Sequence, residues 1–241
     1  LMGAMGGVLY LLLAAVLYSK EQPGHTDYYP LFAAVAAIMI LSAVVVSLTV
    51  REPSREEVLR RDAEEAAREQ RPAGNAAQTE AMPAPVRRSL GFLLLSIALW
   101  FIGYNAVETW FTTYASQVWG MALGESSVCL TIAMAGAIAS YVPVGALAGR
   151  IGRKNTILLG TALLTASFFC AFLSTLAFAQ FSPVMYVLFV MVGIAWAAIS
   201  VNSLPMVVEM CRAGDVGRFT GYYYTFSMAA QTITPIAAGW L

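Results

Sequence analysis

Two carboxylates interrupt otherwise apolar stretches of this 241-residue chain, Glu108 and Glu209. An ionisable group inside a bilayer-spanning segment costs about 3 kcal/mol or more, so it marks a functional site by default. At 3.6 residues per turn, Tyr104, Asn105, Glu108 and Thr112 share one helix face. This face predicts that Glu108 exchanges a proton or binds a hydroxyl group. The competing interpretation is a glutamate that is hydrated near the outer surface.

A stripe of hydrogen-bonding side chains runs along residues 217–241. Thr220, Tyr224, Ser227, Gln231 and Thr234 follow one another in steps of four and three residues, which places them on one helix face. An amide and a phenol suit a polyhydroxylated ligand, whereas polar contacts between helices are the alternative.

Residues 183–208 carry a third set of residues that could bind a ligand. Trp196, Ser200 and Ser203 share a face, with Asn202 and Pro205 beside it. The tryptophan could stack on a sugar ring, and Pro205 is expected to kink the helix and free the carbonyl one turn earlier.

These residues lie in long apolar segments. The chain is 59% hydrophobic and only 12% charged, with a mean hydropathy of +0.69, which exceeds the range of soluble domains. Uniformly apolar runs of about 20 residues cross a bilayer as helices rather than as barrel strands. We therefore predict an all-α polytopic membrane protein with about seven transmembrane helices, at residues 1–18, 30–50, 89–115, 126–149, 155–178, 183–208 and 217–241.

The basic residues predict the orientation. Thirteen of the fourteen Lys and Arg residues fall in every second gap between the apolar runs, and only Lys20 does not. Short loops rich in Lys and Arg stay in the cytoplasm. Residue 1 and the loop 51–88 are therefore expected to be cytoplasmic, and residue 241 to lie outside. Glu209 then lies at a cytoplasmic helix end, where we expect it to pair with a loop arginine.

The polar stretch 51–88 separates two apolar runs from five. Its first half is expected to be helical, since Ser54 and Glu57 form a capping box. Its proline-containing second half is expected to be a flexible tether. Because both chain ends lie inside apolar runs, we interpret the chain as a piece of a longer polypeptide.

Other features argue against competing functions. The net charge of zero gives no support for a nucleic-acid partner. No HExxH or GxSxG motif and no metal-ligand spacing occurs, so neither an enzyme nor a metal or cofactor is expected. The three cysteines, Cys129, Cys170 and Cys211, are expected to be buried thiols. Retinal binding would need a lysine within a membrane helix, but Lys20 and Lys154 lie in loops.

Small residues are frequent in the run 126–149. The spacing of Gly145 and Gly149 would let a neighbouring helix approach closely, so we expect tight packing there.

The segment GALAGRIGRKNTI resembles the cytoplasmic loop motif of the major facilitator superfamily. Gly149 replaces the acid of that motif. The matching residues of this gating motif are Gly145, Arg150, Gly152, Arg153 and Lys154, to which we add Glu209 as the expected ion-pair partner.

The segments GYNAVETW, VNSLPMVVEM and FTGYYYTFSMAAQTITP resemble helices seven, ten and eleven of sucrose and disaccharide–proton symporters and of the glycoside–pentoside–hexuronide group. The resemblance implies that 1–50 holds the last two helices of an N-terminal bundle, 51–88 the inter-bundle loop and 89–241 five helices of the C-terminal bundle. It also implies proton-coupled transport of a disaccharide or related glycoside by alternating access. An exporter of drugs or metabolites is the alternative.

The resemblance further implies a monomer in the cell (inner) membrane, surrounded by lipid, with a sugar and a coupling cation, H⁺, as its small-molecule partners. Glu108 would couple the proton. The residues expected to bind the substrate are Tyr104, Asn105, Glu108, Trp196, Asn202, Tyr224 and Gln231.

Overall fold

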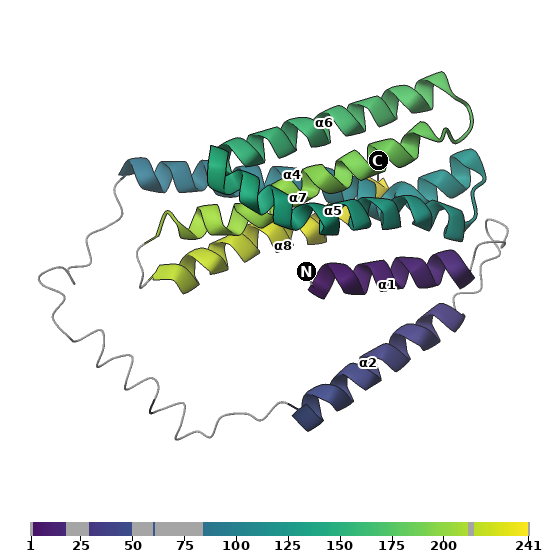
Figure 1. Ribbon diagram of the computed structural model, residues 1–241, viewed down its shortest axis with the longest axis horizontal. Helices are drawn as coiled ribbons and strands as arrows, with labels where there is room; N and C mark the ends of the chain where they lie inside the picture. Colours follow the sequence, from purple (N-terminus) through teal and green to yellow (C-terminus); the bar gives the residue numbers. More distant parts are fainter. Residues whose placement is uncertain (1, 18–28, 50–59, 61–83, 212–214, 241) are drawn as a thin grey trace, which may run out of the picture. The chain divides into compact units, whose positions relative to one another are not determined.

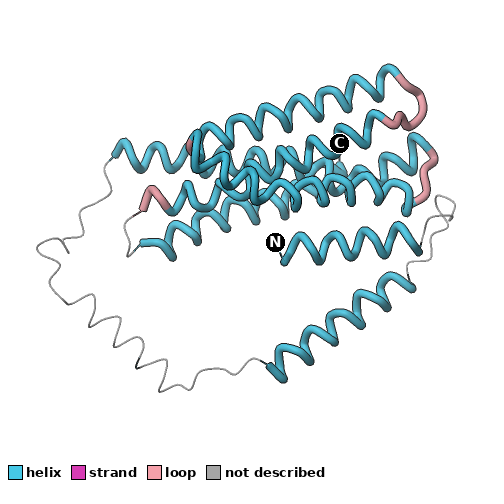
Figure 2. The backbone as a smooth tube through the Cα atoms, in the orientation of Figure 1, coloured by secondary structure: helices cyan, strands magenta, loops and turns pink. Residues whose placement is uncertain are grey.

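The computed structural model describes residues 2–17, 29–49, 60, 84–211 and 215–240. They form seven helices, and no strand occurs among these described residues (Figures 1 and 2). The helices are α1 (Met2–Leu17), α2 (Tyr29–Thr49), α4 (Ala84–Trp119), α5 (Leu123–Ile151), α6 (Arg153–Ala177), α7 (Val184–Val208) and α8 (Val216–Trp240). The predicted all-α fold is confirmed.

Four of these helices, α4 to α7, are long and apolar enough to cross a membrane. Helix α1 has only 16 residues, and α8 has 25 but carries the stripe of hydroxyl and amide side chains that lowers its hydropathy. Helix α4 begins at Ala84, five residues before the predicted start, and Pro85 suits the first turn of a helix. The helix and the tether expected in the first and second halves of 51–88 lie almost wholly outside the described residues.

The described helices belong to two compact units, one holding α1 and α4 to α8 and the other holding α2. In the first unit, α7 packs against α5 and α6, α4 packs along α8, and α1 packs along α5. Helix α7 is the most enclosed of the four candidate spans, because half of its most apolar window is buried (50%).

Helices α4 to α8 run up and down. The α4–α5 and α6–α7 connections lie at one end of this group, and the α5–α6 connection and the start of α8 lie at the other (Figure 1). Every Lys and Arg that the structure describes in this unit lies at the second end, in the first turns of α4, α6 and α8 or the last turn of α5: Arg87, Arg88, Arg150, Arg153, Lys154 and Arg218. This segregation is what the rule for cytoplasmic loops requires.

Close helix packing occurs at a different place from the one predicted. A Cβ atom added to Gly145 or Gly149 would meet nothing within 4 Å, so the expected tight contact at this pair is wrong. The spacing of two glycines shows that they share a helix face but does not say whether another helix packs against that face.

The tight contacts lie elsewhere, between α5 and α7 and between α6 and α7. A Cβ atom at Gly193 would lie 1.9 Å from the carbonyl oxygen of Ala133, and one at Gly160 would lie 2.8 Å from the Cβ of Ala198. Gly136 approaches the carbonyl of Val190 in the same way. We call the contact of Gly193 and Val190 of α7 with Ala133, Gly136 and Ala137 of α5 the glycine seam.

The cysteines are not all buried. Cys129 is fully enclosed between α5 and α7, but Cys170 is exposed on α6 and Cys211 is half-buried after α7. The prediction of three buried thiols is therefore wrong for Cys170.

Candidate functional site

Four helices of the first unit enclose a cavity of about 250 Å³. Its walls carry one carboxylate, two phenols, two amides and an indole, together with apolar side chains. The lining residues are Phe101, Tyr104, Asn105 and Glu108 of α4, Met134, Ala137 and Tyr141 of α5, Trp196 of α7 and Gln231 of α8. We call this space the polar cavity.

The α4 side of the polar cavity arises from the predicted helical spacing. Tyr104, Asn105 and Glu108 lie within little more than one turn, so a single helix delivers all three to the same wall. Phe111, farther along α4, is part of an apolar core with Phe189, whose ring centre lies 4.6 Å away.

An aromatic pair joins α4 to α7 at the cavity wall. The rings of Tyr104 and Trp196 stack at 3.9 Å between centroids and are 9° from parallel, while Phe101 meets Trp196 edge-on at 5.1 Å. Stacked and edge-on contacts are the favoured arrangements of aromatic rings. The pair therefore holds the indole at the cavity edge with an apolar surface beside polar groups.

Glu108 is the one charged residue among the described residues that line the polar cavity. It is half-buried, and Tyr104 lines the same cavity one turn earlier on α4. No described Lys, Arg or His lines this cavity to neutralise it. A partly buried carboxylate without a cationic partner can take up a proton, because burial disfavours its charged form.

The two amides of the cavity are each anchored to their own helix. Asn105 donates through Nδ2 to the carbonyl of Phe101 at 2.7 Å, and Gln231 donates through Nε2 to that of Ser227 at 3.3 Å. A primary amide has two N–H donors and one acceptor oxygen, so each side chain keeps capacity for a further partner.

Two residues expected to bind substrate lie elsewhere. Asn202 is fully buried and donates to the carbonyl of Ala198 at 2.9 Å, while its Oδ1 has no partner. It follows Trp196 by six residues, which is 1.7 turns, so it points to another side of α7. Tyr224 is 46% exposed and is not among the residues that line the polar cavity.

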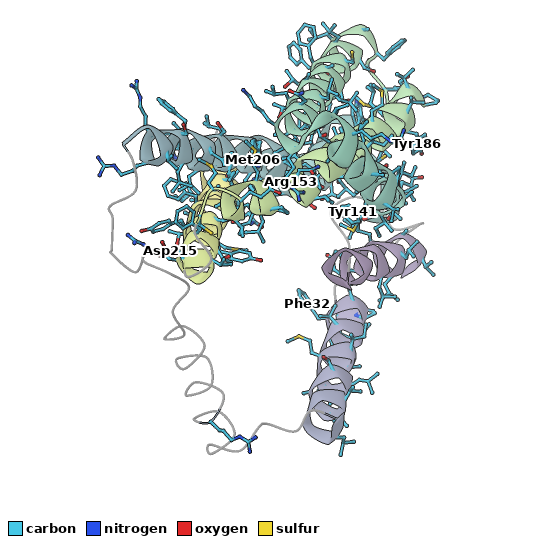
Figure 3. All side chains as sticks on the ribbon, turned by 60° about the vertical axis from the view of Figure 1, so that its left-hand side comes forward. Phe32, Tyr141, Arg153, Tyr186, Met206 and Asp215 are labelled. Atoms are coloured by element: carbon cyan, nitrogen blue, oxygen red, sulfur yellow. The ribbon has the colours of Figure 1, made fainter. Side chains whose placement is uncertain are left out.

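Tyr141 lines the polar cavity from α5 and was not among the predicted residues. It is labelled on α5 in Figure 3. Met134, Ala137 and Tyr141 follow steps of three and four residues, and this spacing could have marked the tyrosine as the polar end of one face.

The cytoplasmic-loop motif is built around a tight link. Gly152 joins α5 to α6 with φ of +87°, a conformation that favours glycine, and places Arg153 at the start of α6. Arg153 then forms an ion pair through Nε with Oε1 of Glu209 at the end of α7. The expected pairing of Glu209 with a loop arginine is confirmed, while Arg150 and Lys154 are exposed.

A second, larger cavity of about 370 Å³ lies on the other side of α4. Helices α4, α6 and α7 line it almost entirely with apolar groups, among them Phe111, Phe168, Phe172, Leu188 and Phe189. It contains no described carboxylate or basic group.

Comparison with known families agrees with this architecture. A family model described as Major Facilitator Superfamily matches residues 1–235, almost the whole chain. Searches of curated proteins and of solved structures gave no match. With its apolar spanning helices and this match, the chain belongs to the Major Facilitator Superfamily, the secondary transporters that cross the lipid bilayer several times and bind small-molecule substrates.

Proposed function

We propose that the protein carries a sugar, a disaccharide or a related glycoside, across the membrane in symport with a proton. The observation that carries this proposal is the composition of the polar cavity: Tyr104, Asn105, Glu108, Tyr141, Trp196 and Gln231 surround one space of about 250 Å³.

This set of groups matches the chemistry of a sugar. A pyranose offers hydroxyl groups at its edge, which both donate and accept, and an apolar ring face. Glu108 can accept two hydrogen bonds, the amides of Asn105 and Gln231 can donate and accept, and the phenols can do either. The indole of Trp196 offers a flat apolar surface for the ring face.

Proton coupling is assigned to Glu108 because it is the single carboxylate of the described lining. We further propose that residues 1–50 belong to one bundle and 89–241 to another, with 51–88 as the cytoplasmic loop between them. Rocking of two such bundles about a central site gives alternating access. The inner cell membrane is the proposed location.

Counterflow uptake tests this function. The complete transporter, reconstituted into vesicles loaded with an unlabelled glycoside, is given the labelled compound outside, and monosaccharides, disaccharides and aryl glycosides are compared. We expect exchange of at least one disaccharide or glycoside, accelerated by internal sugar. A transporter that orients correctly in the vesicles and exchanges none of them would contradict the proposal.

Export of an apolar drug or metabolite is the second candidate, and the apolar cavity of about 370 Å³ favours it. The same vesicles distinguish the two functions when a lipophilic cationic dye replaces the sugar. Proton-driven dye movement without glycoside exchange would favour the exporter, and the reverse result would favour the symporter.

A further inference from the structure

We infer that Gly7 of α1 sets the size of the sugar that the polar cavity accepts, because it makes room for the side chain of Met134. This inference rests on the proposed function and adds a specificity-determining residue to it. Gly7 does not line the polar cavity itself. It acts through Met134, so it is a positioning residue.

Gly7 continues the face of α1 that is buried where this helix packs along α5. Leu11 and Ala14 are buried on this helix, and with Gly7 they follow steps of four and three residues, the spacing of one helix face. A glycine within a helix costs about 1 kcal/mol relative to alanine. The contact with α5 gives a reason for accepting that cost at Gly7.

The end of the Met134 side chain occupies the place where a larger residue on α1 would have its own side chain. A Cβ atom added to Gly7 would lie 2.8 Å from Cε and 2.9 Å from Sδ of Met134. Both distances are shorter than those at which carbon atoms normally make van der Waals contact. A methyl group at residue 7 therefore requires the thioether of Met134 to move.

The side chain of Met134 can yield more easily than its backbone. Ala133 and Ala137, one residue before Met134 and three residues after it, belong to the glycine seam, where the backbone of α5 is held against α7. A methionine side chain is unbranched and has three rotatable bonds, so it adapts to the space that surrounds it. Bulk at residue 7 is therefore expected to turn the end of Met134 rather than to shift α5.

The space open to the displaced thioether is the polar cavity. Met134 lines this cavity of about 250 Å³, and it also lines a small cavity of about 20 Å³ beside Glu108. The small cavity has room for little more than one water molecule. The thioether therefore enters the polar cavity and reduces the space left for a sugar, and the glycine at residue 7 leaves that space at its largest.

A double-mutant cycle on the complete transporter tests this role, with the apparent affinity for the glycoside found by counterflow as the readout. The proteins are wild type, Gly7→Ala, Met134→Ala and the double variant. One methylene group in a fitted pocket changes ligand discrimination by about tenfold or more. We expect Gly7→Ala to weaken the affinity about tenfold in wild type, and less than about twofold in Met134→Ala, which lacks Sδ and Cε.

Gly103→Ala is the matched control. Gly103 precedes Tyr104 on α4, and a Cβ atom there would meet nothing within 4 Å, so this variant should keep the wild-type affinity. The unfolding temperature of each purified protein distinguishes a displaced side chain from a displaced helix. Gly7→Ala should unfold no earlier than wild type, because the flexible end of Met134 yields and alanine favours the helix.

The possible results separate this inference from the proposed function. An unchanged affinity in Gly7→Ala, or a loss that persists in the Met134→Ala background, would overturn the role of Gly7 and leave sugar transport standing. A loss of affinity together with a lower unfolding temperature would mean that α1 moves away from α5, which also overturns it. Absence of glycoside exchange by wild type refutes the proposed function, and the inference about sugar size with it.

Discussion

The polar cavity and the glycine seam lie side by side on α5 and α7 but are built in opposite ways. Apart from Val190, which takes part through its backbone, the seam joins glycine and alanine residues, and a Cβ at Gly193 would lie 1.9 Å from a backbone oxygen. One turn further along α7, Trp196 opens into a space of about 250 Å³ with polar walls. In one region backbones touch, and in the other side chains stand apart.

The difference shows how a helix bundle can hold a hollow site in lipid. Without a hydrophobic driving force between helices, close backbone packing provides much of the adhesion. Ala137 belongs to both regions, since it lines the cavity and its backbone nitrogen lies 2.9 Å from the position of a Gly193 Cβ. The seam therefore fixes the spacing of the α5 and α7 walls while the cavity stays open.

The largest effect should come from Glu108→Gln, on the cavity side alone. The amide keeps the shape of the side chain but cannot carry the proton, so we expect cation-driven accumulation to be abolished while counterflow continues. Uptake assays with and without an imposed pH gradient check this.

The matched control is Glu125→Gln, an exposed carboxylate at the start of α5, whose Oε2 accepts from the backbone N–H of Ala122 at 3.1 Å. The Glu125→Gln variant should accumulate substrate to the same level as wild type. If Glu108→Gln accumulates substrate at wild-type levels with unchanged pH dependence, Glu108 does not couple the proton.

Substitutions in the glycine seam should change the stability of the protein rather than its transport chemistry. We expect Gly193→Ala to force α5 and α7 apart and to cost at least about 3 kcal/mol of stability, because its methyl group overlaps backbone. Gly145→Ala, on the partner helix, meets nothing within 4 Å and should stabilise the protein by up to about 1 kcal/mol. The unfolding temperature of each purified protein in detergent measures the contrast, and equal shifts would show that the seam is not tight.

Gln231→Ala should have a smaller effect, confined to the cavity. Loss of one amide contact is worth about 1 kcal/mol, so we expect a roughly fivefold weaker apparent affinity with unchanged stability. Thr232→Ala, the next and exposed residue, serves as control. An unaltered affinity in Gln231→Ala would remove α8 from the binding site.

Much of the fold and part of the site follow from the sequence. Helix positions could be predicted because uniformly apolar runs of about 20 residues cross a bilayer as helices. Tyr104, Asn105 and Glu108 were predicted to share a wall because they lie within about one turn, and helical periodicity fixes such neighbours. The Arg153–Glu209 pair was expected from charge and orientation, although 56 residues separate its members.

The remainder depends on how the helices are rotated against one another. Periodicity says which residues share a face but not what that face meets, so Gly145 and Gly149 were expected in tight packing that Gly193 and Gly136 provide. Asn202 has the chemistry of a sugar-binding residue, but its position 1.7 turns along α7 from Trp196 turns it to another side of the helix.

The smallest expected effect concerns a third way of joining helices, a hydrogen-bonded clasp between α4 and α8. Trp110 donates through Nε1 to the carbonyl of Pro235 at 3.1 Å, and its ring fills the space beside Gly239. Trp110 follows Glu108 by two residues and Pro235 follows Gln231 by one turn, so the clasp sets the distance between these two cavity groups.

We expect Trp110→Phe to lose about 1 kcal/mol of stability and to weaken apparent affinity about twofold. Trp240→Phe, at a site 90% exposed, is the control. A loss of affinity in Trp110→Phe as large as that of Gln231→Ala would mean that the clasp, more than the glycine seam, holds the cavity in shape.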